Sequence, residues 1–379
     1  MLITSPLPHL SLPDPASELS GDEEARAIEL LHSLVAMPSV SGTERPAVEL
    51  LAARMRELGF RTTIDAVGNA IGEIGSTDPE AREIILLGHI DTVPGDIRVR
   101  REGDLLYGRG TVDAKGPLAA FVIAASTTPV PSGMRLVVIG AVEEETPTSR
   151  GARHIALRRP PFACIIGEPS GSDGIVLGYK GRLLMEATIT TANAHSAGPS
   201  PNAAELIAAW WNRVQAFTET FNAGRERIFE RLQARLREFH TTEDGLTERA
   251  SAVMSFRLPT DVGPDFLETR LRRLGSETGN LHLRFGGHEE AILSDRNNMT
   301  ARSLSVAIRA GGRAPRPTVK TGTSDMNVVG PLWSCPIAAY GPGDSSLDHT
   351  PHEHISMAEY LESIIVLRRA LTHLLTAAG

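Results

Sequence analysis

The fold of this chain is decided by two neighbouring stretches, EIILLGHIDTVPG at residues 83–95 and LYGRGTVDAKG at residues 106–116. The first is an apolar run that ends in the pattern His89-x-Asp91, and the second carries another acid, Asp113, between glycines. An apolar run of this kind predicts a buried strand of a parallel sheet. Imidazole and carboxylate groups at a strand end suit a metal ion, and one carboxylate can bridge two ions. The segment therefore favours a hydrolytic metalloenzyme.

Length and composition indicate a soluble α/β protein with two domains. With 379 residues, the chain exceeds the size at which a single core keeps growing. No apolar run approaches the roughly 18 residues of a membrane helix, and a net charge of −8 argues against binding to nucleic acid. The two cysteines lie far apart, which suits a reducing compartment. We therefore expect a cytoplasmic protein that binds neither nucleic acid nor membranes.

The order of elements predicts an α/β catalytic domain that is interrupted by a smaller domain. Helical and strand-like patterns alternate over 22–178 and return over 296–379, which indicates a mostly parallel, mixed sheet covered by helices. Between these parts, 179–295 has the pattern of an inserted α+β domain. Within it we expect a long helix at the arginine-rich stretch RERIFERLQARLREF, 225–239. Residues 1–21 are rich in proline and are typical of an extension, not of a secretory signal.

Further acids and histidines follow other apolar runs, which predicts one cluster at an edge of the sheet. Glu143, Glu144 and Glu145 follow RLVVIGAV, Glu168 follows ACIIG, and DHTPHEH at 348–354 follows a later run. In an open α/β sheet, sites form at the carboxyl ends of the strands. Several carboxylates there repel one another, and divalent cations relieve this repulsion while lowering the pKa of bound water to about 7. Histidine together with carboxylate suits Zn²⁺ or Co²⁺.

Each of these signals has an ordinary explanation when it is taken alone. Three consecutive glutamates are most often a solvated surface, and the histidines of 348–354 suit a surface loop equally well. What argues for a site is that all of these segments follow apolar runs, one after another along the chain.

The lysines are a separate signal. Only three of the 38 Lys and Arg residues are lysines, and an ammonium and a guanidinium are not interchangeable. We expect Lys115, Lys180 and Lys320 to lie near the chemistry, and chance survival is the alternative.

The motifs GHIDTVPG, GRGTVDAKG, EEE, GEPS, AHSA, GTSD and HxPxE, in this order, resemble those of the co-catalytic zinc amidohydrolases. This family includes acetylornithine deacetylase, succinyl-diaminopimelate desuccinylase and glutamate-type carboxypeptidases, and the resemblance covers about residues 30–370. In detail, IIGEPSG, LGYKGRLL and VKTGTSDMN are most similar to the branch that releases lysine or ornithine from an amino-group carrier protein. The resemblance implies a zinc-peptidase-like catalytic domain with a lid and dimerisation domain at 179–295.

The resemblance also implies two Zn²⁺ per subunit, for which Co²⁺ is a substitute. The ligands would follow the predicted strands: His89 and Glu168 for one ion, Glu145 and His349 for the other, and Asp113 as the bridge. One departure from the family is His352, which stands where Asn or Asp is usual and is therefore an alternative ligand. We choose His349, because Glu353 then falls in register with the motif.

Three further residues would carry catalysis by the same resemblance. Asp91 would orient His89 through the other nitrogen of its ring. Glu144 would be the general base, with Glu143 as the alternative if the motif is shifted by one residue. His195, which alone resembles an ordinary loop residue, would reach the active site of the partner subunit in a homodimer and stabilise the oxyanion.

Substrate-binding groups would come from the motifs GYKGR, SFRLP and KTGTSD. The candidates are Lys180, Arg182, Arg257, Gly322, Thr323 and Ser324. The arginines suit bidentate hydrogen bonds to a carboxylate, and a surface ion pair is their ordinary alternative. The arginine-rich stretch at 225–239 would offer an acidic carrier a docking surface, or would be a solvated helix with Glu–Arg pairs.

The expected reaction is hydrolysis of the amide between the α-amino group of lysine or ornithine and the side-chain carboxyl of a carrier's terminal glutamate. It would serve carrier-dependent lysine and arginine biosynthesis. One alternative is a small-molecule deacylase for acetylornithine, acetyl-lysine or succinyl-diaminopimelate, and another is a metallo-exopeptidase for dipeptides. A binding protein without activity would require the loss of a ligand or of the base, and every expected residue type is present.

Overall fold

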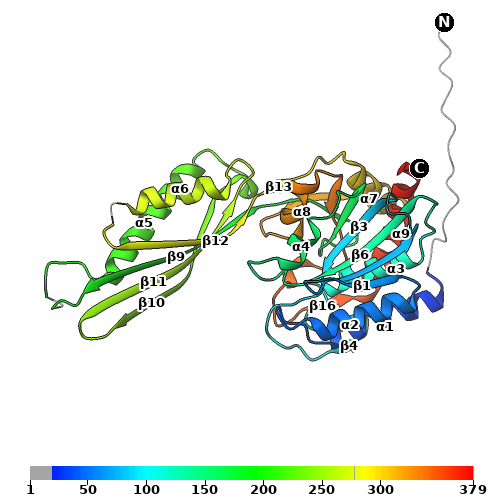
Figure 1. Ribbon diagram of the computed structural model, residues 1–379, viewed down its shortest axis with the longest axis horizontal. Coiled ribbons are helices and arrows are strands. Elements are labelled where there is room, and N and C mark those ends of the chain that lie inside the picture. Colours follow the sequence, from blue (N-terminus) through cyan, green and yellow to red (C-terminus); the bar gives the residue numbers. More distant parts are fainter. Residues whose placement is uncertain (1–18, 196, 277, 379) are drawn as a thin grey trace, which may run out of the picture.

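The structure of the chain, a computed structural model, describes residues 19–195, 197–276 and 278–378. Most of the predicted N-terminal extension lies outside the described residues. Two separate sheets organise the described chain, one of nine strands and one of four. Figure 1 shows that they occupy opposite ends of an elongated molecule and that only a few strands connect them.

The nine-stranded sheet is mixed, with a parallel centre. Its strands are β1 (Arg61–Ile64), β2 (Ala70–Gly75), β3 (Arg82–His89), β6 (Met134–Ala141), β7 (Ala163–Gly167), β8 (Gly174–Tyr179), β13 (Ile292–Leu293), β14 (Arg316–Lys320) and β15 (Ile337–Ala339). β3 runs parallel to both β6 and β7, whereas β2 and β13 are antiparallel to their neighbours. Every residue of β6 and β7 is buried, as the continuous apolar runs predict. The predicted mostly parallel, mixed sheet is therefore confirmed.

Helices cover both faces of this sheet. They are α1 (Gly21–Ala36), α2 (Arg45–Glu57), α3 (Lys115–Ser126), α4 (Arg150–Ile155), α7 (Met299–Ala310), α8 (Asp325–Trp333) and α9 (Met357–Ala378). Successive residues of β3 point to opposite faces, so Ile84 and Leu86 pack under α1, α3 and α9, whereas Ile85 and Leu87 pack under α4 and α8. No helix in the described part of the chain is long and apolar enough to span a membrane.

A small three-stranded sheet lies beside the main one. It consists of β4 (Arg100–Glu102), β5 (Leu105–Tyr107) and β16 (His354–Ser356), and a short 3-10 helix, η2 (Ser345–Leu347), precedes its last strand. β16 pairs with β5 in antiparallel register, with His354 opposite Tyr107. This pairing brings the loop after β5 and the loop before β16 together, although they are far apart in the sequence.

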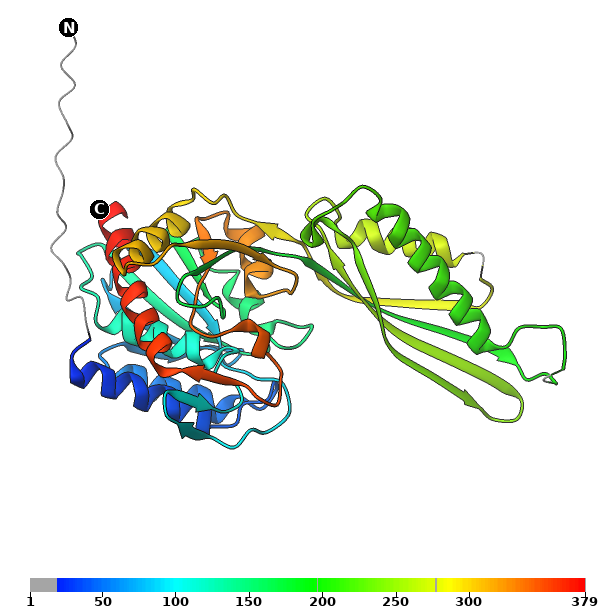
Figure 2. The same cartoon turned by 180° about the vertical axis from the view of Figure 1, so that it is seen from behind.

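The four-stranded sheet belongs to the insert and has its own core. Its strands are β9 (Gly181–Ala192), β10 (Gln233–Glu243), β11 (Thr247–Leu258) and β12 (Leu281–Glu289), and the helices α5 (Ala203–Asn222) and α6 (Pro264–Gly275) cover one face (Figure 2). Trp210 of α5 and Phe256 of β11 are fully buried between helices and sheet. The division of the chain at 179 and 295 stays a prediction, and in the structure the second sheet spans Gly181–Glu289.

The long helix expected at 225–239 is wrong. This stretch forms a short 3-10 helix, η1 (Ile228–Glu230), and then most of β10, an edge strand that pairs with β11. Leu232, Leu236 and Phe239 have the spacing of a helical face, but β11 supplies hydrogen-bond partners for an extended backbone. Tertiary pairing of this kind overrides a local pattern.

Candidate active site

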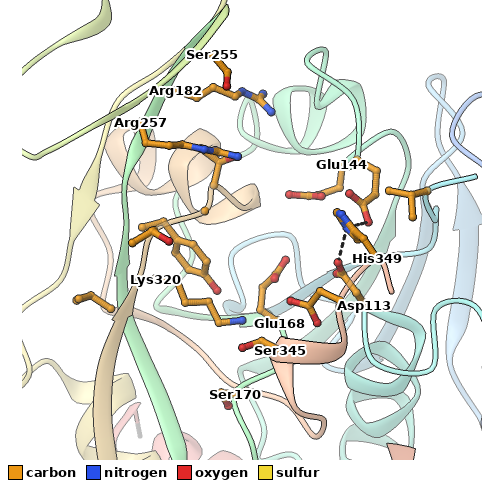
Figure 3. A pocket seen from close by; sticks show the side chains of 18 of the residues that line it. Asp113, Glu144, Glu168, Ser170, Arg182, Ser255, Arg257, Lys320, Ser345 and His349 are labelled. Atoms are coloured by element: carbon orange, nitrogen blue, oxygen red, sulfur yellow. Dashed lines mark hydrogen bonds and ion pairs between the residues drawn. The ribbon is translucent and has the colours of Figure 1, made fainter. Parts of the chain in front are cut away.

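The carboxyl ends of β3, β6 and β7 meet at one edge of the main sheet. His89, the last residue of β3, is in register with Ala141 at the end of β6, and Gly88 is in register with Gly167 at the end of β7. The acids that follow these strands therefore reach the same level. They line a cleft of about 810 Å³ that also receives side chains from the insert (Figure 3).

Asp113 lies between two histidines at the centre of this cluster. One of its oxygens, Oδ1, is 3.1 Å from Nε2 of His89, and the other, Oδ2, is 2.9 Å from Nε2 of His349. His349 also lies 2.9 Å from Oε1 of Glu145, and His89 lies 3.9 Å from Oε1 of Glu168. The five side chains thus form two histidine–glutamate pairs with Asp113 between them.

The pKa values of Glu144, Glu168 and His349 are raised, because the cluster contains several buried carboxylates that favour added positive charge. Burial, together with the negative charge of the neighbouring Asp113, raises the pKa of Glu168 to about 8. Burial likewise raises the pKa of Glu144 well above its usual range. Hydrogen bonds to Asp113 and Glu145 raise the pKa of His349 to about 10. In this state, protons neutralise groups that a cation would otherwise neutralise.

The donor set fits divalent metal ions of the zinc type. Ligand atoms of His89, Asp113 and Glu145 lie within 4.8 Å of one another, which is a candidate metal-binding site. Imidazole nitrogens and carboxylate oxygens are the donors that such ions prefer. No thiolate takes part, because Cys164 is buried within β7 on the α4–α8 side of the sheet.

Asp91 is completely buried and holds the glutamate loop in place. Its carboxylate accepts hydrogen bonds from the backbone N–H groups of Glu144 and Glu145, both at 3.0 Å, and from the hydroxyl of Ser41 at 2.7 Å. Its carboxylate also lies 3.5 Å from Nδ1 of His89, and its backbone oxygen is closer, at 3.0 Å. Asp91 therefore lies against the far nitrogen of His89 and also holds the loop that carries Glu144 and Glu145.

The three consecutive glutamates point in different directions. Glu143 has a left-handed backbone with φ of 58° and pairs with Arg150 at 2.9 Å and with the hydroxyl of Thr148 at 2.8 Å. Glu144 and Glu145 line the cleft instead. Among the described residues, nothing donates a hydrogen bond to the carboxylate of Glu144. A free, buried carboxylate is suited to accept a proton, which favours Glu144 over Glu143 as the base.

His349, not His352, belongs to the cluster. His349 has a left-handed backbone with φ of 61°, and its Nε2 contacts both Asp113 and Glu145. His352 is exposed, and its contacts within the described residues are made by its backbone. The geometry thus favours the histidine that the motif register indicated.

Glu353 is a site residue for which the sequence suggested no role. It is fully buried, and its carboxylate accepts hydrogen bonds from the backbone N–H groups of Val112 at 2.9 Å and Asp113 at 3.2 Å. It also pairs with Arg109 at 2.8 Å. Since Glu353 lies four residues after His349, this contact fixes the two loops that carry Asp113 and His349. Its register in HxPxE and the arginine of GRG were the available signals.

The substrate-binding candidates lie at two depths. Arg182 and Arg257 are register partners on β9 and β11, and both line the cleft together with Gly322 and Thr323. Arg257 donates a hydrogen bond of 3.1 Å to the hydroxyl of Thr323, so the insert and the main sheet touch there. Ser324 is buried beneath them as the N-cap of α8.

Two of the three lysines have their charges engaged elsewhere. The ammonium of Lys180 donates to the backbone oxygen of Ile228 at 3.0 Å, to that of Arg231 and to the side chain of Gln233, so it anchors the stretch before β10. The ammonium of Lys115 is buried against backbone oxygens at the end of α1. Lys320 alone among them lines the cleft. Arg237, from the arginine-rich stretch 225–239, also lies there, as does Arg316, which was not singled out from the sequence.

His195 lies far from the cleft of its own chain. It is exposed in the loop after β9, where its Nδ1 accepts a hydrogen bond of 3.1 Å from the backbone of Ala197. β9 runs from Arg182 in the cleft to Ala192, a span of roughly 30 Å at about 3.3 Å per residue. Figure 1 shows this strand reaching the outer end of the insert. The structure therefore does not bring His195 together with the other predicted site residues.

Comparison with known proteins adds a family and named relatives. The model of peptidase family M20/M25/M40 matches residues 85–373. A "[LysW]-lysine hydrolase" from Deinococcus radiodurans is 44% identical over 354 residues, covering 92% of this chain and 97% of that protein. A "Putative [LysW]-lysine/[LysW]-ornithine hydrolase" from Thermococcus kodakarensis is 38% identical, covering 90% of each.

Solved structures with a similar fold are more distant in sequence. An M20 family metallo-carboxypeptidase from Sulfolobus solfataricus has a TM-score of 0.76 at 18% identity, covering 92% of this chain and 99% of that one. The aminopeptidase PepT from Bacillus cereus has a TM-score of 0.73 at 17% identity, covering 93% and 98%. At these identities the likeness establishes the fold alone.

Proposed function

Because the chain belongs to the peptidase family M20/M25/M40, we propose that it is a metal-dependent amide hydrolase that releases lysine, ornithine or both from an amino-group carrier protein of the LysW type. The bond cleaved joins the α-amino group of the amino acid to the side-chain carboxyl of the carrier's terminal glutamate. The observation that carries the proposal is Asp113 between two histidine–glutamate pairs, in a cleft that also contains arginines. The names of the relatives, which align with nearly the whole chain, support the substrate.

We propose two Zn²⁺ ions per subunit, with Co²⁺ as a substitute. His89 and Glu168 would hold one ion, Glu145 and His349 the other, and Asp113 both. When bound, the ions supply Lewis acidity, which polarises a carbonyl and makes water acidic enough to react near neutral pH. The distribution of Asp113 oxygens between the two histidines supports this assignment.

Glu144 would move the proton that the reaction requires. Its carboxylate takes a proton from the attacking water, whose oxygen bonds to the amide carbon. It then gives the proton to the leaving α-amino nitrogen as the carbon–nitrogen bond breaks. The burial of Glu144 and the absence of a hydrogen-bond donor to its carboxylate among the described residues support this role.

A second copy of the chain would complete the site. We propose a homodimer in which the partner's His195 stabilises the negative charge that develops on the amide oxygen. The remoteness of His195 from the cleft of its own chain supports action in the other subunit. Arg182 and Arg257 would bind a substrate carboxylate.

We also propose that the protein acts in the cytoplasm, in lysine and arginine biosynthesis. The free thiols of Cys164 and Cys335 suit the reducing conditions there.

An activity panel tests the proposal. Zinc- and cobalt-loaded protein is given carrier-linked lysine and ornithine, N-acetylornithine, N-acetyl-lysine, succinyl-diaminopimelate and dipeptides, and release of the amino acid is measured. We expect the highest kcat/KM for a carrier-linked substrate. A higher kcat/KM for an acetyl or succinyl compound would make the protein a small-molecule deacylase, and a preference for dipeptides would make it an exopeptidase. The Glu144→Gln variant controls for contaminating hydrolases.

A further inference from the structure

Lys320 is a half-buried cation of the cleft. It is the last residue of β14 and is followed directly by the loop that contains Gly322 and Thr323. Among the residues that the structure describes, none forms a hydrogen bond or an ion pair with its ammonium. Lys115 and Lys180, in contrast, are saturated by oxygen atoms of the chain. Hydrogen bonds within the chain therefore account for a lysine at positions 115 and 180, but not for Lys320.

The charge of Lys320 acts on the rim of the metal site. Burial raises the pKa of both Glu168 and Asp348, and the positive charge of Lys320 partly opposes the increase in each case. Lys320 nevertheless forms no ion pair with either of these carboxylates. Once cations neutralise Glu168, the ammonium is left facing the cleft. Its charge is then free to attract an anionic part of the substrate.

Positive charge flanks the metal ligands from two sides of the cleft. Figure 3 shows Arg182 and Arg257 at the upper end of the cleft, and Lys320 at its lower end, at the level of Glu168 and Asp113. The arginines belong to strands of the insert, whereas Lys320 belongs to the main sheet. The cleft therefore offers cationic side chains from both parts of the molecule, enough to bind two carboxylates.

We propose that Lys320 binds a carboxylate of the substrate on the opposite side of the scissile amide from the carboxylate held by Arg182 and Arg257. This inference rests on the proposed function, because that substrate carries one carboxylate on each side of the amide. One is the α-carboxylate of the released amino acid, and the other is the α-carboxylate of the terminal glutamate. An ammonium on a flexible stem suits a single carboxylate as a compact point charge.

The test uses three small probes with zinc-loaded protein. Nα-(γ-glutamyl)-lysine has both carboxylates, Nα-(4-aminobutanoyl)-lysine lacks the one on the acyl side, and Nα-(γ-glutamyl)-lysinamide lacks the one on the amine side. We expect Lys320→Met to raise KM for the complete probe by about 10- to 100-fold, the effect of losing one hydrogen bond to a charged group. Zinc content and kcat should change little. The increase in KM should be absent for the probe that lacks the carboxylate bound by Lys320. This result would show which of the two substrate carboxylates Lys320 binds.

A matched control is Arg316→Ala on the same strand. Arg316 also lines the cleft and is cationic, but it pairs with Asp173 at 3.0 Å and is largely exposed. It should alter KM for the complete probe by less than about threefold, as expected for an exposed pair. Lys320→Arg should recover part of the affinity that Lys320→Met loses.

Two results would overturn the assignment of Lys320. One is an equal penalty on all three probes, which would indicate a general effect on the site. The other is an unchanged KM throughout. Turnover of carrier-linked lysine by the unmodified protein is measured alongside, because its absence would refute the proposed function. Normal turnover with an unchanged KM in Lys320→Met would refute the role of Lys320 alone.

Discussion

Replacing Glu353 is the sharpest test of how the site is held together, because this side chain contacts no proposed ligand atom and reaches Asp113 only through its backbone N–H. Its carboxylate is fully buried, accepts two backbone N–H groups and pairs with Arg109 at 2.8 Å. Glu353→Ala leaves Arg109 as an unpaired, mostly buried charge, which costs about 3–5 kcal/mol of folding free energy. Glu353→Gln keeps the volume and one acceptor, so we expect a loss of about 1–3 kcal/mol. The milder variant is therefore the informative one.

The quantity to measure is the affinity for zinc. Since the two backbone N–H groups belong to the Asp113 loop, their release loosens Asp113 relative to His349. Loss of such supporting contacts typically weakens metal binding by 10- to 100-fold. We expect this weakening in Glu353→Gln, measured by competition with a chelator, together with a lower melting temperature of both metal-free and zinc-loaded protein.

The matched control for this experiment is Glu83→Gln. Glu83 pairs with Arg135 at 2.6 Å, and both side chains are largely buried at the end of β3 that is remote from the site. This variant should lose stability but keep the zinc affinity of the unmodified protein. Zinc affinity that is unchanged in Glu353→Gln, or weakened equally in Glu83→Gln, would refute the reasoning.

Three other experiments address the ligands and the dimer. Binding of zinc at pH 7 should release protons, because Glu168 with a pKa of about 8 and His349 with a pKa of about 10 hold protons in the metal-free protein. Zinc affinity should therefore rise between pH 6 and about 8, which calorimetry in buffers of different ionisation enthalpy can measure. His349→Ala should lose one of two bound ions by elemental analysis, and His352→Ala should keep both. His195→Ala and Glu144→Gln should each be inactive, yet subunit exchange between them should restore about a quarter of normal activity, since half of the dimers would contain one intact site. No recovery on mixing would place His195 in its own subunit or outside catalysis.

The parts of the site that follow buried strands were predictable because their signal is local. An apolar run fixes a strand, parallel pairing fixes a common edge, and the polar residues that come next must lie there. His89, Glu145 and Glu168 meet for this reason. The direction of a side chain after the strand is less local. Glu143 turns toward Arg150 because its backbone is left-handed, which three identical residues in a row do not reveal.

The parts that were missed depend on contacts between distant residues. Glu353 acquires its role only by meeting Val112, 241 residues away in sequence. Lys180 adjoins a cleft residue, Arg182, but its ammonium satisfies oxygen atoms that are brought near by the segment before β10. The strand β10 itself depends on β11 for its backbone hydrogen bonds. In all three cases the local sequence pattern is compatible with more than one structure, and contacts with residues distant in the sequence determine which structure forms.

The origin of the cationic side chains bears on how the cleft selects its substrate. The proposed metal ligands all lie outside the insert, whereas Arg182 and Arg257 belong to its strands. A substrate with a carboxylate on each side of its amide would contact Arg182 and Arg257 across the cleft from Lys320 and so engage both parts of the molecule. An acetyl amino acid has no acyl-side carboxylate and would engage only one side. If both contacts are worth what hydrogen bonds to charged groups usually contribute, the missing one lowers kcat/KM by about 10- to 100-fold. Discrimination between carrier-linked and acetylated substrates would then need no difference in the metal centre.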